Sequence, residues 1–142
     1  CFLARQLPVA VELARKCPDV RLVLDHCGVP DIASSELDPW RNNIREMSKL
    51  PNVACKLSGL PTYCKPGEAT LDTIRPWAMH CIETFGPDRV LWGGDWPVCV
   101  INSDLPKWIG ITRQLVGGLS AAEQKKILHE NAVRVYRIKS GS

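Results

Sequence analysis

The sequence has no long hydrophobic run and no block of one charge, and each absence removes a class of protein. No apolar stretch approaches the roughly 20 residues that a membrane-spanning helix requires. The 18 basic and 15 acidic residues give a net charge of +3 and are interspersed along the chain. Nucleic acid and membrane surfaces usually require a clustered basic face, so we expect neither as a partner.

Nucleotide-binding and serine-hydrolase motifs are also absent. The sequence contains no phosphate loop, no GxGxxG and no GxSxG elbow, which excludes the commonest nucleotide-binding proteins and serine hydrolases. Residues 1–5 lack the layout of a signal peptide and do not begin with Met. We therefore expect the chain to start partway through a longer protein.

The seven cysteines are odd in number and irregularly spaced. None forms a CxxC pair, which excludes zinc ribbons and thioredoxin-like proteins. Cys55 and Cys81 lie in apolar runs, where a thiol packs as a small hydrophobic group. These features predict reduced cysteines and a cytoplasmic protein.

The chain of 142 residues, with 45% hydrophobic and 23% charged residues, has the composition of one globular domain. Short apolar runs that predict strands alternate with segments of helical periodicity. The predicted strands cover residues 20–24, 53–57 and 89–92, and the predicted helices cover 7–17, a segment from Pro39 capped by Asp38, a segment ending at Phe85, 105–116, and a last segment from Ser120 to Tyr136.

Two details of this pattern remain open in the sequence. Pro76 must lie in the first turn of the helix that ends at Phe85, or kink it. Residues 140–142 read as a frayed tail or a cloning remnant. Strands that are separated by single helices pair in parallel, and apolar strands without alternation are covered on both faces. The sequence therefore predicts an α/β fold with a parallel sheet.

Polar residues follow each of the three predicted strands. They are Asp25 and His26, then Lys56 with Ser58, and finally Asp95. Functional groups of parallel α/β folds gather at the carboxyl ends of the strands. We therefore expect these residues to lie together along the carboxyl edge of the sheet, which we call the rim.

Asp95 is the leading candidate for a catalytic group. Two glycines precede it, which allows a tight turn or a close approach of the backbone to a ligand, and Trp92 and Trp96 flank the motif and could exclude water. A carboxylate in this position can bind a metal or deprotonate a water molecule. The alternative is an aspartate that caps the next helix or a turn.

His26 could bind a metal or donate a hydrogen bond to a developing oxyanion, or it could be a core histidine that bonds a backbone carbonyl. Asp25 is expected to orient a neighbour or to cap. Lys56 could pair with a carboxylate, bind an anionic substrate group or extend to solvent, because burying an unpaired ammonium is costly. On the predicted helices we expect His80 and His129 at the surface, and three tryptophans in the core: Trp40, Trp77 and Trp108.

Four motifs resemble those of a known family. They are Leu24-Asp25-His26-Cys27-Gly28-Val29-Pro30, the segment 52–59, the segment 85–97 that ends in Gly-Gly-Asp-Trp-Pro, and the terminal segment 131–136. In this order they resemble the amidohydrolase superfamily of TIM-barrel metal-dependent hydrolases, in the branch of L-fuconolactone and L-rhamnonolactone hydrolases. The resemblance extends from Leu7 to Ile138.

The resemblance implies that residues 1–138 form the carboxyl-terminal half of a (β/α)8 barrel and that 139–142 are a tail. Such barrels need about 250 residues, and the HxH pair that the family carries after its first strand is absent here. By analogy, Asp95 takes a proton from the water that attacks a lactone carbonyl, and His26 stabilises the oxyanion. His26 and Asp95 are also the candidate ligands of a divalent metal, zinc first, if a metal is used at all. Lys56 and Trp96 match motif positions and are assigned to substrate binding.

Two alternatives to a lactone hydrolase follow from the same residues. A nonoxidative decarboxylase of the superfamily keeps the histidine and the aspartate but requires a firmly bound metal. A non-catalytic half-barrel would expose strand edges and core, so it should associate with a copy of itself or with the missing amino-terminal half. The chain alone is expected to be inactive.

Overall fold

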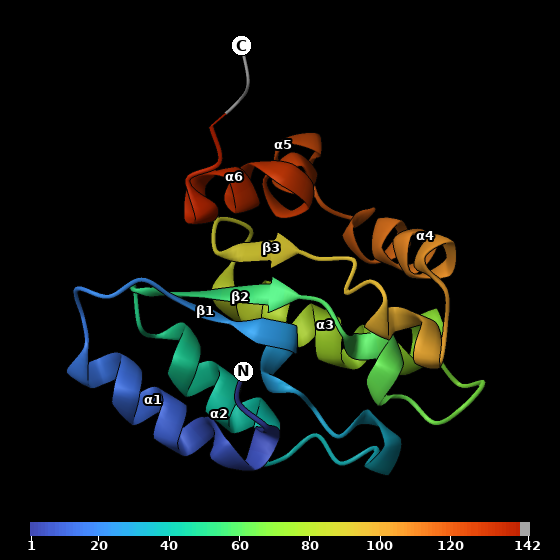
Figure 1. The fold of residues 1–142 in the computed structure, drawn as a ribbon, viewed down its shortest axis with the longest axis horizontal. Helices are drawn as coiled ribbons and strands as arrows, with labels where there is room; N and C mark the ends of the chain where they lie inside the picture. The colour runs from blue at the N-terminus through green and yellow to red at the C-terminus, as the bar shows by residue number, and fades with distance from the viewer. Residues whose placement is uncertain (140–142) are drawn as a thin grey trace.

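The computed structural model describes residues 1–139, in which three parallel strands lie in the order β1–β2–β3 (Figure 1). The strands are β1 (Leu22–Leu24), β2 (Val53–Leu57) and β3 (Val90–Trp92). Leu24 pairs with Cys55, and Leu57 pairs with Trp92, so the carboxyl ends of neighbouring strands lie close together. The predicted parallel α/β fold is confirmed, although β1 begins two residues later than the apolar run.

Helices connect the strands and cover the sheet. Figure 1 shows α1, α2 and α3 along one side of the strands and the last helical segment along β3. None of the helices within residues 1–139 is both long and apolar enough to span a membrane. The bounds are α1 (Leu7–Lys16), α2 (Trp40–Ser48), α3 (Leu71–Phe85), α4 (Leu105–Val116), α5 (Ala121–Lys125) and α6 (Asn131–Tyr136), with a π-helical turn at Lys126–Glu130 between the last two.

The helix ends confirm one predicted cap and correct another. Ser120 and Glu123 form the reciprocal capping box that opens α5. Asp38 does not cap α2: the helix begins at Trp40, which leaves Asp38 one position too far out, and its carboxylate faces the guanidinium of Arg41 at 3.4 Å instead. Pro76 lies beyond the first turn of α3, inside a helix that continues to Phe85.

The core between the sheet and the helices contains the predicted tryptophans. Trp40, Trp77 and Trp108 are buried, and His129 is exposed as expected. His80 was expected at the surface, and this is wrong, because α3 packs against α2 and encloses its ring. The Nε2 atom of His80 lies 2.9 Å from the carbonyl of Arg41, and its ring is 5.5 Å from that of Trp40.

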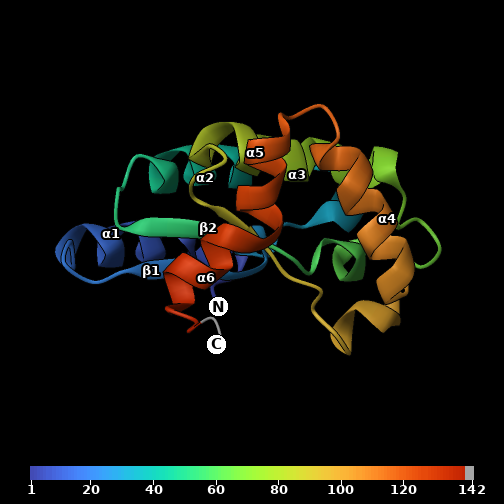
Figure 2. The ribbon, with the colours of Figure 1, turned by 90° about the horizontal axis from the view of Figure 1, so that it is seen from above.

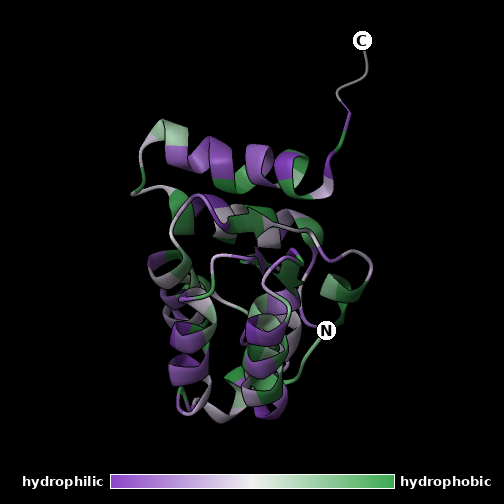
Figure 3. Ribbon diagram, turned by 90° about the vertical axis from the view of Figure 1, so that its left-hand side faces the viewer, coloured by the Kyte–Doolittle hydropathy of each residue, from purple (hydrophilic) through white to green (hydrophobic). Residues whose placement is uncertain are grey.

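The helices are amphipathic, with hydrophilic stretches interrupted by the residues that they bury (Figure 3). At the amino edge of the sheet, polar side chains donate hydrogen bonds to backbone carbonyls at the strand starts and in the helices and loops that precede them. Arg89 donates to the carbonyls of Ser48, Leu50 and Val53. Asn52 and Asn131 do the same for five other carbonyls, those of Ala14, Cys17, Val20, Pro87 and Val90. Buried carbonyls that lack a partner are costly, so these side chains stabilise the frame on which the opposite edge is built.

Candidate active site

The three polar strand ends meet at the carboxyl edge of the sheet, as the sequence predicts. Figure 2 shows the segments that follow β2 and β3, together with α4, on the side to which the strands point. His26 lies in the turn after β1 (Asp25–Gly28), and Asp95 follows β3. The Nδ1 atom of His26 is 3.9 Å from Oδ1 of Asp95, and the two side chains are 20% and 14% exposed. An imidazole and a carboxylate therefore share one partly desolvated corner.

A hydrogen bond to Ser58 orients the ring of His26. Ser58 is buried directly after β2, and its Oγ lies 2.8 Å from Nδ1 of His26. If Nδ1 donates to Ser58, Nε2 offers a lone pair to a metal; if Ser58 donates to Nδ1, Nε2–H can donate to an oxyanion. Gly59 (φ +73°) packs below the ring, where an added Cβ would lie 2.9 Å from Nδ1.

Both candidate catalytic residues have left-handed backbone conformations. His26 has a φ of 53° and Asp95 a φ of 55°. Next to His26, Cys27 and the β-branched Val29 also have positive φ, at 53° and 50°. Such conformations cost about 1–3 kcal/mol each and cluster at functional sites. The strain at two strand ends supports a functional role for this rim.

Lys56 forms an ion pair with a carboxylate at the rim, which is the first of the three environments predicted from the sequence. Its Nζ atom lies 2.9 Å from Oδ1 of Asp25. Burial alone would lower the pKa of Lys56, but the hydrogen bond and the charge of Asp25, with smaller contributions from Tyr136 and Asp95, leave that pKa raised. Asp25 thus orients a neighbour, as expected, and Lys56 stays charged at neutral pH.

Tyr63 belongs to the same rim and has no recognisable signal in the sequence. It ends a short turn (Leu60–Tyr63) rather than a strand, so neither the strand-end rule nor a motif identifies it. Burial, together with the negative charge of Asp95, raises the pKa of Tyr63 to about 12. Its hydroxyl therefore stays protonated at neutral pH.

The two tryptophans that flank the Gly-Gly-Asp motif have different environments. Trp92 is partly buried, and its Nε1 donates to Oγ1 of Thr112 on α4 at 2.9 Å. Trp96 is 70% exposed. The exposed indole of Trp96 thus differs from the expectation that both indoles are packed against Asp95.

The donor set of the rim fits part of a zinc site. Zinc prefers imidazole nitrogen and carboxylate oxygen in such sites and takes at least three protein ligands when catalytic. His26 and Asp95 supply one donor of each kind. Within residues 1–139, the metal-type donors that cluster in groups of three or more are cysteines elsewhere in the core. His26 and Asp95 thus offer two candidate ligands, fewer than the three protein ligands that a catalytic zinc site takes.

Comparison with known families agrees with the fold. The family model described as Amidohydrolase matches residues 1–138, so the chain belongs to the amidohydrolase family. A crystal structure of an amidohydrolase from Burkholderia multivorans with bound zinc superposes with a TM-score of 0.91 and 33% identity, over 96% of this chain and 51% of that one.

Relatives of known activity point to lactones. An L-fucono-1,5-lactonase from Burkholderia ambifaria is 33% identical over 138 residues, which cover 94% of this chain and 47% of the relative. An L-rhamnono-gamma-lactonase from Scheffersomyces stipitis is 26% identical, over 94% of this chain and 45% of the relative. The chain spans about half the length of the curated relatives that it matches. The resemblance to lactonases extends along nearly the whole chain.

Proposed function

We propose that this chain contributes His26 and Asp95 to the active site of an enzyme that hydrolyses a sugar-acid lactone of the L-fuconolactone or L-rhamnonolactone type. The observation that carries the proposal is the 3.9 Å approach of the two side chains at the carboxyl edge of the sheet. The lactonase relatives support the substrate class. The relatives that bear the name of a lactonase favour this function over the decarboxylase alternative.

Asp95 acts as the general base in this proposal. Its carboxylate takes a proton from a water molecule, and the water oxygen attacks the lactone carbonyl carbon. The carbonyl π electrons move to the oxygen, and His26 stabilises the resulting oxyanion. The tetrahedral intermediate then expels the ring oxygen, which takes the proton from Asp95 as the carbon–oxygen bond breaks. The product is an open-chain hydroxy acid, and both residues return to their starting states.

Lys56 and Trp96 bind the substrate in this scheme, and Tyr63 joins them. Asp25 occupies one face of the Lys56 ammonium, which still has donors for hydroxyl or carboxylate oxygens of the ligand. The exposed indole of Trp96 offers a flat apolar surface against which a sugar ring can stack. The neutral hydroxyl of Tyr63 can donate a hydrogen bond close to Asp95.

A divalent metal, with zinc as the first candidate, fits this site as an additional component. His26 and Asp95 would hold it together with ligands from outside this chain. When bound, zinc would polarise the lactone carbonyl and lower the pKa of a coordinated water. We propose that the remaining ligands come from an amino-terminal half-barrel, joined to this chain or associated with it, or from a second copy, and that this chain alone is inactive. The free cysteines support a reducing, cytoplasmic location.

A pH-indicator assay with a panel of lactones tests the proposed function on the protein in its complete form. L-fucono-1,5-lactone and L-rhamnono-1,4-lactone should release acid faster than simple aliphatic lactones, because Lys56, Tyr63 and Trp96 recognise the sugar. Assays after chelation and after zinc addition determine whether the metal is required. Absence of turnover with every lactone of the panel, with and without zinc, would remove the proposal.

A further inference from the structure

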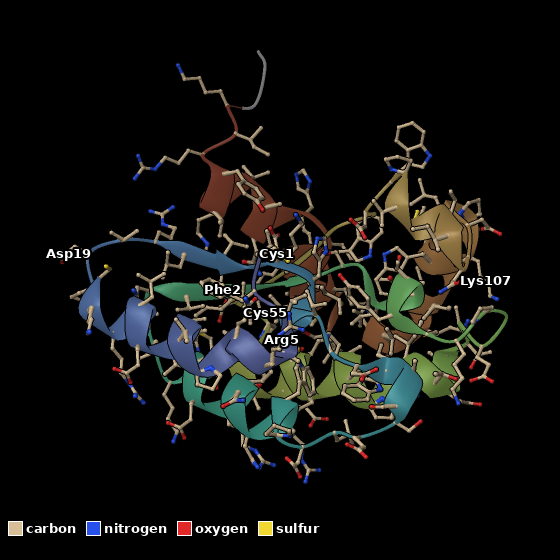
Figure 4. All side chains as sticks on the ribbon, turned by 60° about the horizontal axis from the view of Figure 1, so that its bottom comes forward. Cys1, Phe2, Arg5, Asp19, Cys55 and Lys107 are labelled. Atoms are coloured by element: carbon tan, nitrogen blue, oxygen red, sulfur yellow. The ribbon has the colours of Figure 1, made fainter. Side chains whose placement is uncertain are left out.

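Three buried cysteines from separate elements converge directly beneath the candidate active site. Cys27 lies in the turn after β1, Cys55 lies in β2, and Cys81 lies in α3. All three side chains are fully enclosed, and their Sγ atoms lie within 4.8 Å of one another. Figure 4 places Cys55 in the interior, between the strands and the helices.

The three thiols lie close to one another inside the hydrophobic core. The Cys27 thiol donates to the carbonyl of Lys56 at 3.6 Å. No disulfide links any cysteine in the described part of the chain. The Cys64 thiol, by contrast, is buried elsewhere and donates to its own turn at the carbonyl of Leu60.

The spacing of the sulfurs suits a three-coordinate metal ion. Zinc–sulfur bonds of about 2.3 Å, arranged in a trigonal plane, would space the sulfurs about 4.0 Å apart. The cluster needs to contract by an amount on the order of 1 Å at most, which side-chain rotation can supply. Soft thiolate donors select soft cations such as Cu(I) and zinc over the hard ions that prefer oxygen ligands.

We propose that Cys27, Cys55 and Cys81 form a buried thiolate site for a soft d10 cation, distinct from the nitrogen and oxygen donors of His26 and Asp95. On binding, three sulfur–hydrogen bonds break, three protons pass to solvent, and three sulfur–metal bonds form without any change in oxidation state. The inference depends on the sulfur geometry alone and holds whether or not the chain is part of a lactonase.

Occupation of this site has a structural consequence. The metal would link the turn after β1 to β2 and α3, segments that lie 26 to 54 positions apart in the sequence. Because the unfolded chain does not hold the three sulfurs together, binding stabilises the folded state. Cys27 adjoins His26, and Cys55 adjoins Lys56, so the same ion would also fix two residues of the rim.

Titration with Cd(II) tests the proposal, because cadmium–thiolate bonds absorb in the ultraviolet and bonds to nitrogen or oxygen do not. The titration uses a variant with the substitutions Cys1→Ser and Cys17→Ser, which remove the two thiols that are not buried. We expect one equivalent of Cd(II) to produce the absorption, to release three protons and to raise Tm. The substitution Cys81→Ala should reduce the cadmium–thiolate absorption. The matched control Cys64→Ala, which removes another buried thiol, should leave that absorption unchanged.

Three results would overturn the proposal. They are the absence of thiolate absorption at one equivalent, equal absorption in Cys81→Ala, and equal loss in Cys64→Ala. If circular dichroism shows that Cys81→Ala is unfolded, the number of protons released per Cd(II) by the parent protein decides: three supports a three-thiolate site, and one or none contradicts it.

Discussion

The polar side chains at the two edges of the three-stranded sheet have different hydrogen-bonding partners. At the amino edge, Arg89, Asn52 and Asn131 donate to backbone carbonyls, so each side chain supports the frame. At the carboxyl edge, side chains pair with one another: His26 with Ser58 and Asp95, and Lys56 with Asp25. Backbone strain also differs, since His26 and Asp95 have positive φ values.

This contrast indicates that the amino edge contributes to stability and the carboxyl edge to chemistry. Groups bound to backbone carbonyls have their hydrogen-bonding capacity committed in the folded state. The groups at the carboxyl edge keep faces that a water molecule or a ligand can use, and the frame supports their strain. Substitutions at the amino edge should therefore reduce stability and spare activity, while those at the carboxyl edge should do the reverse.

The largest effect is expected for Asp95→Asn. Removal of the general base should lower kcat for lactone hydrolysis by roughly 10²- to 10⁴-fold. The fold should remain, since the amide has nearly the same shape. The matched control is Asp88→Asn at the amino edge, where the exposed carboxylate pairs with Lys126. Steady-state kinetics on both variants of the protein in its complete form checks this, and full activity in Asp95→Asn would contradict the assigned role.

The next effect is expected at the opposite edge, for Arg89→Met. Three carbonyls lose a charged donor, so the free energy of unfolding should fall by about 2–4 kcal/mol. Activity per folded molecule should change little. Denaturant unfolding with Arg45→Met as the exposed control tests the contrast, and equal losses in the two variants would count against it.

Gly59→Ala should affect both properties moderately. Its φ of +73° disfavours a side chain by about 1 kcal/mol. The new Cβ would also displace His26, and misplacement of a catalytic group by about 1 Å can cost up to about 10²-fold in rate. Gly67→Ala is the control, because Gly67 has a φ of +80° with open space around it. If both variants lose the same activity, the contact with His26 is unimportant.

The smallest effect concerns alkaline pH. The fold raises the pKa of Tyr63 from 10.0 to about 12, so the folded state holds this proton more tightly than the unfolded state does. Its contribution to stability is complete below pH 10 and is lost as the pH rises through about 12. Tyr63→Phe should flatten the decline of Tm over this range, whereas Tyr136→Phe, at an exposed position, should not.

The strand ends were predictable from the sequence because they depend on local pattern. His26, Lys56 and Asp95 lie at or just after the ends of apolar runs, which places them at one rim of a parallel sheet. Features that depend on packing between distant segments were not predictable. These are the burial of His80 by α2, the influence of the Asp95 charge on Tyr63, and the convergence of three cysteines. Asp38 failed as a cap because the helix start shifted by one residue.

The central claim is that His26 and Asp95 act on the same carbonyl, and a double-mutant cycle tests it most directly. The four proteins are the parent, His26→Asn, Asp95→Asn and the double variant, compared by kcat/KM for the preferred lactone. Residues that act as a unit are strongly non-additive, so the double variant should be about as slow as the slower single variant. Multiplication of the two single losses would contradict the claim.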